Sequence, residues 1–252
     1  MTGALARNWP VWDSVPHELE KLLARFSQLV VEQPRISEID INPLLASSER
    51  LIALDARVVL HGNHVQEDEL PKPAIRPYPS QYVWRSKLRD GTNVIIRPIR
   101  PEDEPLMARF HQTLSDRSVY LRYFCSLSLK RRVAHERLVR ICFGDYDREM
   151  ALVAEHNDAT GSREIIGVGR LSRLHGSTEA EMAVVVSDNF QKRGLGGELL
   201  RRVIQVARAE NVTAVSGEML PDNLAMQTLL KRSGFRVQMT PDLSYSRARL
   251  DL

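Results

Sequence analysis

Near the N-terminus, the spacing of hydrophobic residues predicts one helix followed by two short strands. Apolar side chains recur at helical spacing over residues 16–31, and Pro16 suits the first turn of a helix. Residues 36–41 and 51–60 have the composition of strands and are separated by a polar stretch. We expect this unit to be too small for a stable core of its own.

A proline-rich segment separates this region from the rest of the chain. It contains Pro71, Pro73, Pro77 and Pro79. Because proline restricts the backbone to extended conformations, the segment predicts a semi-rigid linker or a strap that packs along an edge of the domain. We therefore divide the chain into a small first region, a linker and a larger domain, at residues 1–70, 71–82 and 83–252.

Beyond the linker, alternating and helical patterns predict a mixed α/β sheet with helices on both faces. The chain opens with a hairpin whose turn is Asp90-Gly91. Two helices, three strands, a helix, a strand, a helix and two strands follow. The expected strands are residues 82–88, 93–99, 150–155, 165–174, 180–186, 214–217, 235–238 and 245–250, and the expected helices begin at Pro101 or cover 130–141, 194–209 and 223–233.

A glycine-bearing loop joins the strand that ends in Val184, Val185 and Val186 to the helix that follows. The loop consists of Gln191, Lys192, Arg193, Gly194, Leu195 and Gly196. Unpaired backbone N–H groups and the positive end of the helix dipole bind phosphate at such a helix start. Glycine lets the ligand approach the backbone closely. The loop therefore predicts a cofactor that carries a pyrophosphate.

Composition limits the alternatives. The formal net charge of +3 over 252 residues does not indicate a nucleic-acid partner. No apolar run approaches the roughly 20 residues that span a bilayer, and the first residues lack the order of a signal peptide. Cys125 and Cys142 have no metal-ligand spacing, so we expect two buried free thiols, no metal and a cytoplasmic protein. The oligomeric state stays open.

The larger domain resembles the GNAT acetyltransferases from about residue 83 to 252. The glycine loop resembles their pyrophosphate loop, residues 223–235 resemble their second CoA motif, and residues 96–103 resemble their opening strand and helix entry. The resemblance implies a mostly antiparallel GNAT sheet and acetyl-CoA as the donor substrate. It also implies cofactor contacts from Asn223 and Met226, in addition to the loop and residues 184–186. Asn223 is also expected to cap its helix.

The first region resembles the end of the ATP-grasp domain of NDP-forming acyl-CoA synthetases. Residues 38–44 and 53–57 carry the likeness, and Asn42 and Asp55 match positions that hold magnesium in that family. The part that grips the nucleotide has no counterpart here, so we expect a remnant without nucleotide binding. An ATP-grasp remnant before a GNAT domain is similar to the Pat-type bacterial protein lysine acetyltransferases. That resemblance implies a protein lysine as acceptor, with acyl-CoA synthetases as the substrate class.

Direct acetyl transfer needs a base, because a lysine amine with a pKa of about 10.4 is protonated at neutral pH. We expect Glu181 to be this base, with Glu179 and Glu155 as alternatives, and the backbone N–H of Val184 to stabilise the oxyanion. The resemblance implies a tyrosine general acid in the last CoA helix, but residues 223–233 contain none. Ser233 or unassisted departure of the thiolate are the remaining choices.

For the remaining histidines, basic residues and aromatic residues, we expect structural roles rather than catalytic or ligand-binding ones. We expect His111, His135, His156 and His175 to lie on surfaces or helix faces, and residues 130–132 to form a solvated helix start. Tyr120, Tyr123 and Phe124 are expected in the core. A sensor that binds acetyl-CoA without turnover and a small-molecule amine acetyltransferase remain alternatives to a protein lysine acetyltransferase.

Overall fold

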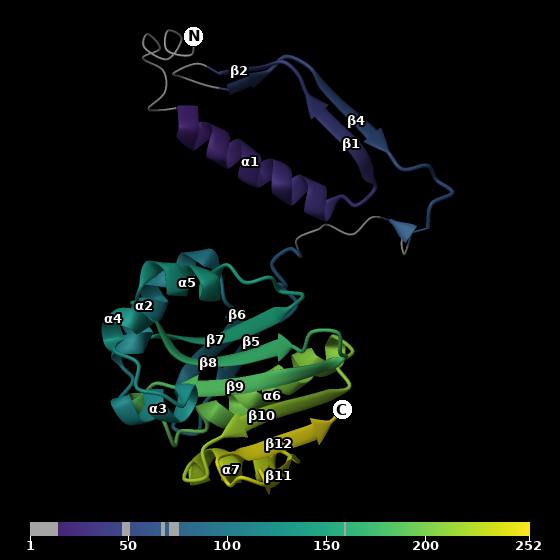
Figure 1. Ribbon diagram of the computed structural model, residues 1–252. Helices are drawn as coiled ribbons and strands as arrows, with labels where there is room; N and C mark the ends of the chain where they lie inside the picture. The colour runs from purple at the N-terminus through teal and green to yellow at the C-terminus, as the bar shows by residue number, and fades with distance from the viewer. Residues whose placement is uncertain (1–14, 47–50, 67–68, 71–75, 159) are drawn as a thin grey trace, which may run out of the picture. The chain divides into compact units, whose positions relative to one another are not determined.

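The computed structural model describes residues 15–46, 51–66, 69–70, 76–158 and 160–252. The chain separates into two compact units, Met1–Pro77 and Tyr78–Leu252. Figure 1 labels the helices and strands of both units. Among the described residues, no helix is both long and apolar enough to cross a membrane.

The first unit is a helix followed by two small antiparallel strand pairs. Its elements are α1 (Val15–Glu32), β1 (Ile36–Ile41), β2 (Leu44–Ala46), β3 (Leu51–Ala53) and β4 (Ala56–Leu60). β1 pairs with β4, and β2 pairs with β3.

The helix and the strand at residues 36–41 are confirmed, but a single strand over residues 51–60 is wrong. The chain changes partner at Leu54 and Asp55, where the Leu54 N–H donates to the Pro43 carbonyl and the Asp55 carbonyl accepts from the Asn42 N–H. A run of strand-forming residues does not reveal where a strand changes its partner.

The second unit is built on one eight-stranded sheet with the order β11-β12-β10-β9-β8-β7-β6-β5 (Figure 1). The strands are β5 (Trp84–Lys87), β6 (Asn93–Pro98), β7 (Glu149–Asn157), β8 (Arg163–Arg173), β9 (Glu179–Val186), β10 (Ala214–Met219), β11 (Arg236–Met239) and β12 (Ser246–Asp251). β9 and β10 pair in parallel, and every other neighbouring pair in this sheet is antiparallel. The mostly antiparallel mixed sheet is therefore confirmed.

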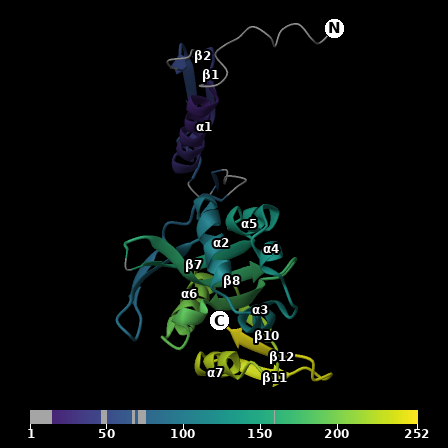
Figure 2. The same ribbon diagram turned by 90° about the vertical axis from the view of Figure 1, so that its left-hand side faces the viewer.

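Helices cover both faces of the sheet (Figure 2). They are α2 (Glu104–Gln112), α3 (Asp116–Tyr123), α4 (Leu129–Arg132), α5 (His135–Cys142), α6 (Leu195–Ala209) and α7 (Leu224–Arg232), with short 3₁₀ turns η2 (Pro101–Asp103) and η3 (Asp188–Phe190). Alternation along the strands supplies two cores: Leu152 packs in the core that contains α6 and α7, and its neighbour Val153 packs in the core that contains α2 and α5.

Side chains of the α6 helix pack directly over two glycines of β8. A Cβ at Gly167 would be 2.9 Å from Leu199 Cδ1, and a Cβ at Gly169 would be 2.9 Å from Val203 Cγ2. A side chain at either position would require Leu199 or Val203 to shift, so the two glycines favour the close packing of α6 on β8.

The helical segment between the hairpin and β7 differs from the prediction. The sequence predicted two helices there, but the structure has α2, α3, α4 and α5. α3 was missed because Val119 is its one buried residue, so it lacks a hydrophobic stripe. Its signal is the cap: the Ser115 hydroxyl accepts from the Ser118 N–H at 3.2 Å.

Several side chains expected at the surface or in the core lie elsewhere. Arg132 was expected to be solvated, but it is 4 % exposed and donates to the backbone carbonyls of Leu127 and His111. Cys142 is buried as predicted, whereas Cys125 is exposed. Tyr120 was expected in the core and is 43 % exposed.

The second unit begins within the segment that was predicted as a linker. The Tyr78 hydroxyl donates to the Pro98 carbonyl at 3.1 Å, and the ring of Tyr82 stacks on Trp84. These contacts attach Tyr78 and Tyr82 to the sheet.

Candidate active site

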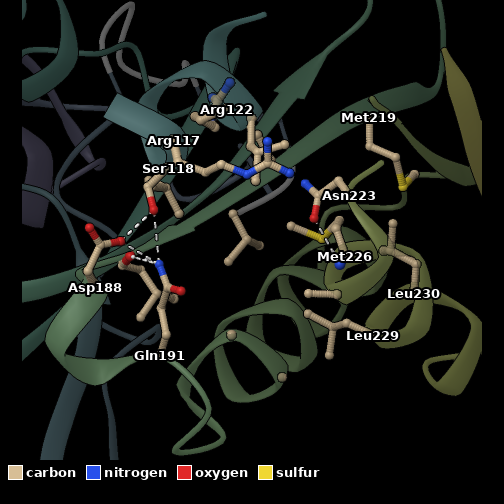
Figure 3. A pocket seen from close by; sticks show the side chains of 18 of the residues that line it. Arg117, Ser118, Arg122, Asp188, Gln191, Met219, Asn223, Met226, Leu229 and Leu230 are labelled. Atoms are coloured by element: carbon tan, nitrogen blue, oxygen red, sulfur yellow. Dashed lines mark hydrogen bonds between the residues drawn. The ribbon is translucent and has the colours of Figure 1, made fainter. Parts of the chain in front are cut away.

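A cavity of about 690 Å³ lies where β9 and β10 part (Figure 3). Its walls come from the glycine loop, the C-terminal half of β9, α3, the end of β10 and the start of α7. The lining includes Glu181, Val184, Val185, Val186, Gln191, Lys192, Gly194, Gly196, Asn223 and Met226, all of which the sequence singled out. The sequence and the structure thus lead to the same cleft.

The end of parallel pairing creates the opening. β9 and β10 are in register as far as Glu181 and Ser216, and no pairing follows. Just beyond, the backbone of β10 still lies tight against β9: a Cβ at Gly217 would be 3.1 Å from the Met182 carbonyl oxygen. The strands then diverge, and residues 184–186 of β9 are exposed to the cavity.

The glycine loop forms one rim of the cavity. Gly194 has φ +94°, a conformation that glycine adopts at little cost, and α6 begins at the next residue. A Cβ at Gly196 would be 3.6 Å from Leu229 of α7, so the passage between loop and helix is narrow. Leu195, by contrast, is 1 % exposed and belongs to the core rather than to the cavity.

Arg193 does not line the cavity. Its guanidinium binds the Asp90 carboxylate at 3.0 Å and lies over the ring of Phe190. The hairpin turn supplies a different cation: the side chain of Arg89 crosses Gly194, with its Nε 3.3 Å from where a Cβ would be, and it lines the cavity. Sequence reasoning missed Arg89, because only the folded hairpin brings it to the loop.

The Gln191 side chain is part of a network that ties the glycine loop to α3 (Figure 3). Its Nε2 donates to Asp188 Oδ1 at 2.7 Å and to Ser118 Oγ at 3.1 Å. Asp188 also accepts from the Ser118 hydroxyl and from the Ser115 N–H. Burial raises the pKa of Asp188, but the hydrogen bonds from Ser118 and Ser115 outweigh it and lower the pKa overall. The network therefore fixes the loop through a charged acceptor.

The opposite wall is the start of α7. The Asn223 side chain accepts from the Met226 N–H at 3.2 Å, so the predicted N-cap is confirmed, and both residues line the cavity. Arg117 of α3 extends toward Asn223 and binds Asp222 at 3.0 Å (Figure 3). Ser233, at the far end of α7, donates to the Leu229 carbonyl and is not part of the lining.

The three candidate bases have different surroundings. Glu179 is held by two hydrogen bonds from Arg249, at 2.7 and 2.8 Å, and these hydrogen bonds lower its pKa. Glu155 is buried and bound by Arg97 at 2.6 Å, and Arg97 also binds buried Asp103.

Glu181, by contrast, lines the cavity. Among the described residues, no hydrogen bond or ion pair engages its carboxylate. Of the three, Glu181 is therefore the carboxylate available to accept a proton at the cavity.

In the first unit, Asn42 and Asp55 lie together at the ends of β1 and β4. Among the described residues, no group of three or more His, Cys, Asp or Glu side chains is arranged to hold a metal ion.

Comparison with known proteins agrees with this architecture. Residues 93–236, more than half of the chain, match the family described as the acetyltransferase (GNAT) domain, and residues 11–60 match the ATP-grasp domain. An acetyltransferase of Pseudomonas aeruginosa is 31 % identical over 160 residues, which cover 63 % of this chain and 83 % of that protein. The acetyltransferase Pat of Mycolicibacterium smegmatis is 29 % identical over 182 residues, which cover 71 % of this chain but 50 % of Pat.

Solved structures show the same fold. The GNAT domain of S. lividans PAT superposes with a TM-score of 0.62 at 27 % identity, covering 70 % of this chain and all of that chain. Mycobacterium smegmatis RimJ, solved in complex with CoA-disulfide, has a TM-score of 0.53 at 16 % identity and covers 67 % of this chain and 86 % of its own. With its glycine loop at the start of α6 and its splayed β9 and β10, this chain belongs to the GNAT acetyltransferase family and carries a short ATP-grasp segment before the GNAT domain.

Proposed function

We propose that the chain transfers the acetyl group of acetyl-CoA to the ε-amine of a protein lysine, with Glu181 as the general base. The main support is the cavity itself, because the glycine loop and the unengaged Glu181 carboxylate face the same space. The pyrophosphate would lie at the loop, with Lys192 and Arg89 as nearby cations. The acyl end would then point along β9 toward Glu181.

The proposed reaction is a direct transfer. The neutral amine nitrogen attacks the thioester carbonyl carbon, a C–N bond forms, and the C–S bond breaks to release CoA. Glu181 takes one proton from the lysine ammonium, directly or through water, to give this neutral amine, and the second proton on the nitrogen passes to water as the amide forms. The backbone N–H of Val184, at the part of β9 that is no longer paired with β10, is our candidate donor to the oxyanion. The thiolate leaves without a protein acid, because Ser233 does not line the cavity.

A protein acceptor is favoured by the relatives. The chain covers half the length of Pat and the whole of the GNAT domain of S. lividans PAT. We carry over from the resemblance to Pat-type enzymes the choice of a lysine on an acyl-CoA synthetase. The exposed Cys125 thiol fits the reducing cytoplasm in which we place the reaction.

The test is transfer from labelled acetyl-CoA to a purified acyl-CoA synthetase, with the modified lysine located by mass spectrometry. Glu181→Gln should reduce the rate about 10²- to 10⁴-fold and leave CoA affinity unchanged. Glu179→Gln is the matched control, since Glu179 lies on the same strand but is bound by Arg249.

A transfer rate in Glu181→Gln equal to that of the unmodified chain would show that Glu181 is not the general base. Label on free amines alone would indicate a small-molecule enzyme. CoA binding without transfer to any amine would indicate a sensor.

A further inference from the structure

Two arginines, Arg122 and Arg137, lie against the ring of Tyr123, and the charges of a third, Arg170, and of the proposed base Glu181 act on Arg122. The guanidinium carbons of Arg122 (α3) and Arg137 (α5) each lie 5.1 Å from the centre of the Tyr123 ring. Arg170 of β8 is close enough for its charge to act on Arg122, as the charges of Arg137 and Glu181 also do. All three arginines are half-buried. We call this set the arginine cluster.

The sheet register places the cluster on the same face as Glu181. Arg170 lies directly opposite Ala183 on β9, and Ala183 is two residues from Glu181. Residues opposite each other, and residues two apart along a strand, share a face. α3 packs against β9 and thereby brings Arg122 over this face. Arg122, like Glu181, lines the cavity.

The carboxylates in the structure do not fully satisfy the cluster. Glu149 binds Arg170, yet the Arg170 Nε is buried without a hydrogen-bond partner, and so is the Arg137 Nε. Among the described residues, Arg122 makes no hydrogen bond. Burial is the main cause that lowers the pKa of Arg122; Tyr123 and Glu181 act against it, and the positive charges of Arg170 and Arg137 act with it. The cluster therefore has nearby negative charge from Glu149 and Glu181 but hydrogen-bond donors that no carboxylate engages, and a half-buried guanidinium in this state favours binding a further carboxylate.

We propose that Arg122 binds a carboxylate of the acceptor, so that the site selects a lysine with an aspartate or glutamate close to it in the polypeptide. This inference rests on the proposed lysine acetylation. A guanidinium and a carboxylate form short, charge-assisted hydrogen bonds, often two at once. Because Arg122 and Glu181 line one cavity, a bound carboxylate would hold the neighbouring amine near the base. Arg137 and Arg170, behind Arg122, add positive charge without contacting the acceptor.

The experiment uses the full chain and peptides that contain one lysine. The peptides are made in pairs that differ only in the residue next to the lysine, which is Glu in one peptide and Gln in the other. CoA release and peptide acetylation are both measured. We expect kcat/KM to be about tenfold or more higher for the Glu peptide. Arg122→Gln should reduce this ratio to about one, and Arg122→Lys should restore part of it. Arg140→Gln, an exposed arginine on the same helix as Arg137, should keep the full ratio.

A second measurement keeps the inference separate from catalysis. Anisotropy of labelled peptides on the CoA-saturated chain reports the same Glu-to-Gln preference without turnover. Equal rates or equal affinities for the Glu and Gln peptides in the unmodified chain would overturn the inference. A preference for the Glu peptide that persists in Arg122→Gln would also overturn it. A binding preference without acetylation would instead overturn the proposed function.

Nα-acetyl-lysine and its carboxamide form the last pair, which distinguishes a free amino-acid carboxylate from an acidic side chain. A preference confined to this pair would contradict the peptide acceptor that we propose.

Discussion

His111 should make the second unit sensitive to acid. This residue belongs to α2, and its side chain is 1 % exposed. Both ring nitrogens are buried without hydrogen-bond partners among the described residues. Burial lowers its pKa from 6.5 to about 4, and the nearby cations Arg132 and Arg137 contribute in the same direction. The folded protein therefore keeps His111 neutral at a pH where the unfolded chain binds a proton.

The sign and size follow from proton linkage. Between pH 6.5 and 4 the unfolded state binds more protons at this position, so the free energy of unfolding decreases as the pH falls. The contribution is fully present above pH 6.5 and is lost by pH 4. A shift of that size corresponds to about 3 kcal/mol at 1.36 kcal/mol per pH unit. This is a large fraction of the stability of a typical domain.

Urea unfolding at pH 7 and at pH 4, followed by circular dichroism, measures this contribution. We compare the unmodified chain with His111→Leu, which cannot titrate, and with His175→Gln, which changes an exposed histidine. The unmodified chain and His175→Gln should lose about 3 kcal/mol more than His111→Leu on acidification. Other titrating groups affect all three proteins and cancel in the difference. Equal losses in all three proteins would show that His111 is not held neutral by burial.

Two further predictions concern residues that hold the site in place. Arg97→Met should lower the free energy of unfolding by about 3–5 kcal/mol, because it leaves Asp103 and Glu155 as buried charges without their cation. The rate of acetyl transfer per folded molecule should stay unchanged. A variant that keeps its stability but loses transfer would make Glu155 a candidate base again. Asp188→Asn should raise the KM for acetyl-CoA about fivefold, because it weakens the charged acceptor that holds Gln191. The control is Asp158→Asn, which changes a turn aspartate with similar local hydrogen bonds and should leave the KM unchanged. Equal KM values in both variants would show that the Asp188 network does not contribute to cofactor binding.

Much of the second unit could be predicted from the sequence because its signals are local. A hydrophobic run, a glycine turn and an amphipathic pattern lie next to each other at β9, Gly194 and α6. Asn223 at the start of α7 is a cap that a short stretch of sequence reveals, and Gly234, with φ +89°, follows the end of that helix. Motifs of this kind depend on neighbours along the chain, so one sequence is enough to recognise the GNAT fold.

The sequence also suggested three carboxylates for one catalytic role and preferred Glu181, but strand pattern alone did not exclude Glu179 or Glu155. Strand position alone makes Glu179 and Glu181 equivalent, because they share a face of β9. The partner strands and helices supply Arg249 for Glu179 and Arg97 for Glu155, and they leave Glu181 beside the cavity. Whether a carboxylate is able to accept a proton from a substrate depends on which cations lie beside it in the folded protein.

The same distinction holds for the residues that sequence reasoning missed. Arg89 reaches Gly194 from a hairpin about a hundred residues earlier in the chain, and Ser118 reaches Asp188 from a helix that has almost no hydrophobic face. The arginine cluster unites α3, α5 and β8. The sequence by itself thus determined the family, the glycine loop and the strand that leads to it. Only the tertiary structure decided which charges meet there, because strand order and helix packing bring together residues that no local pattern connects.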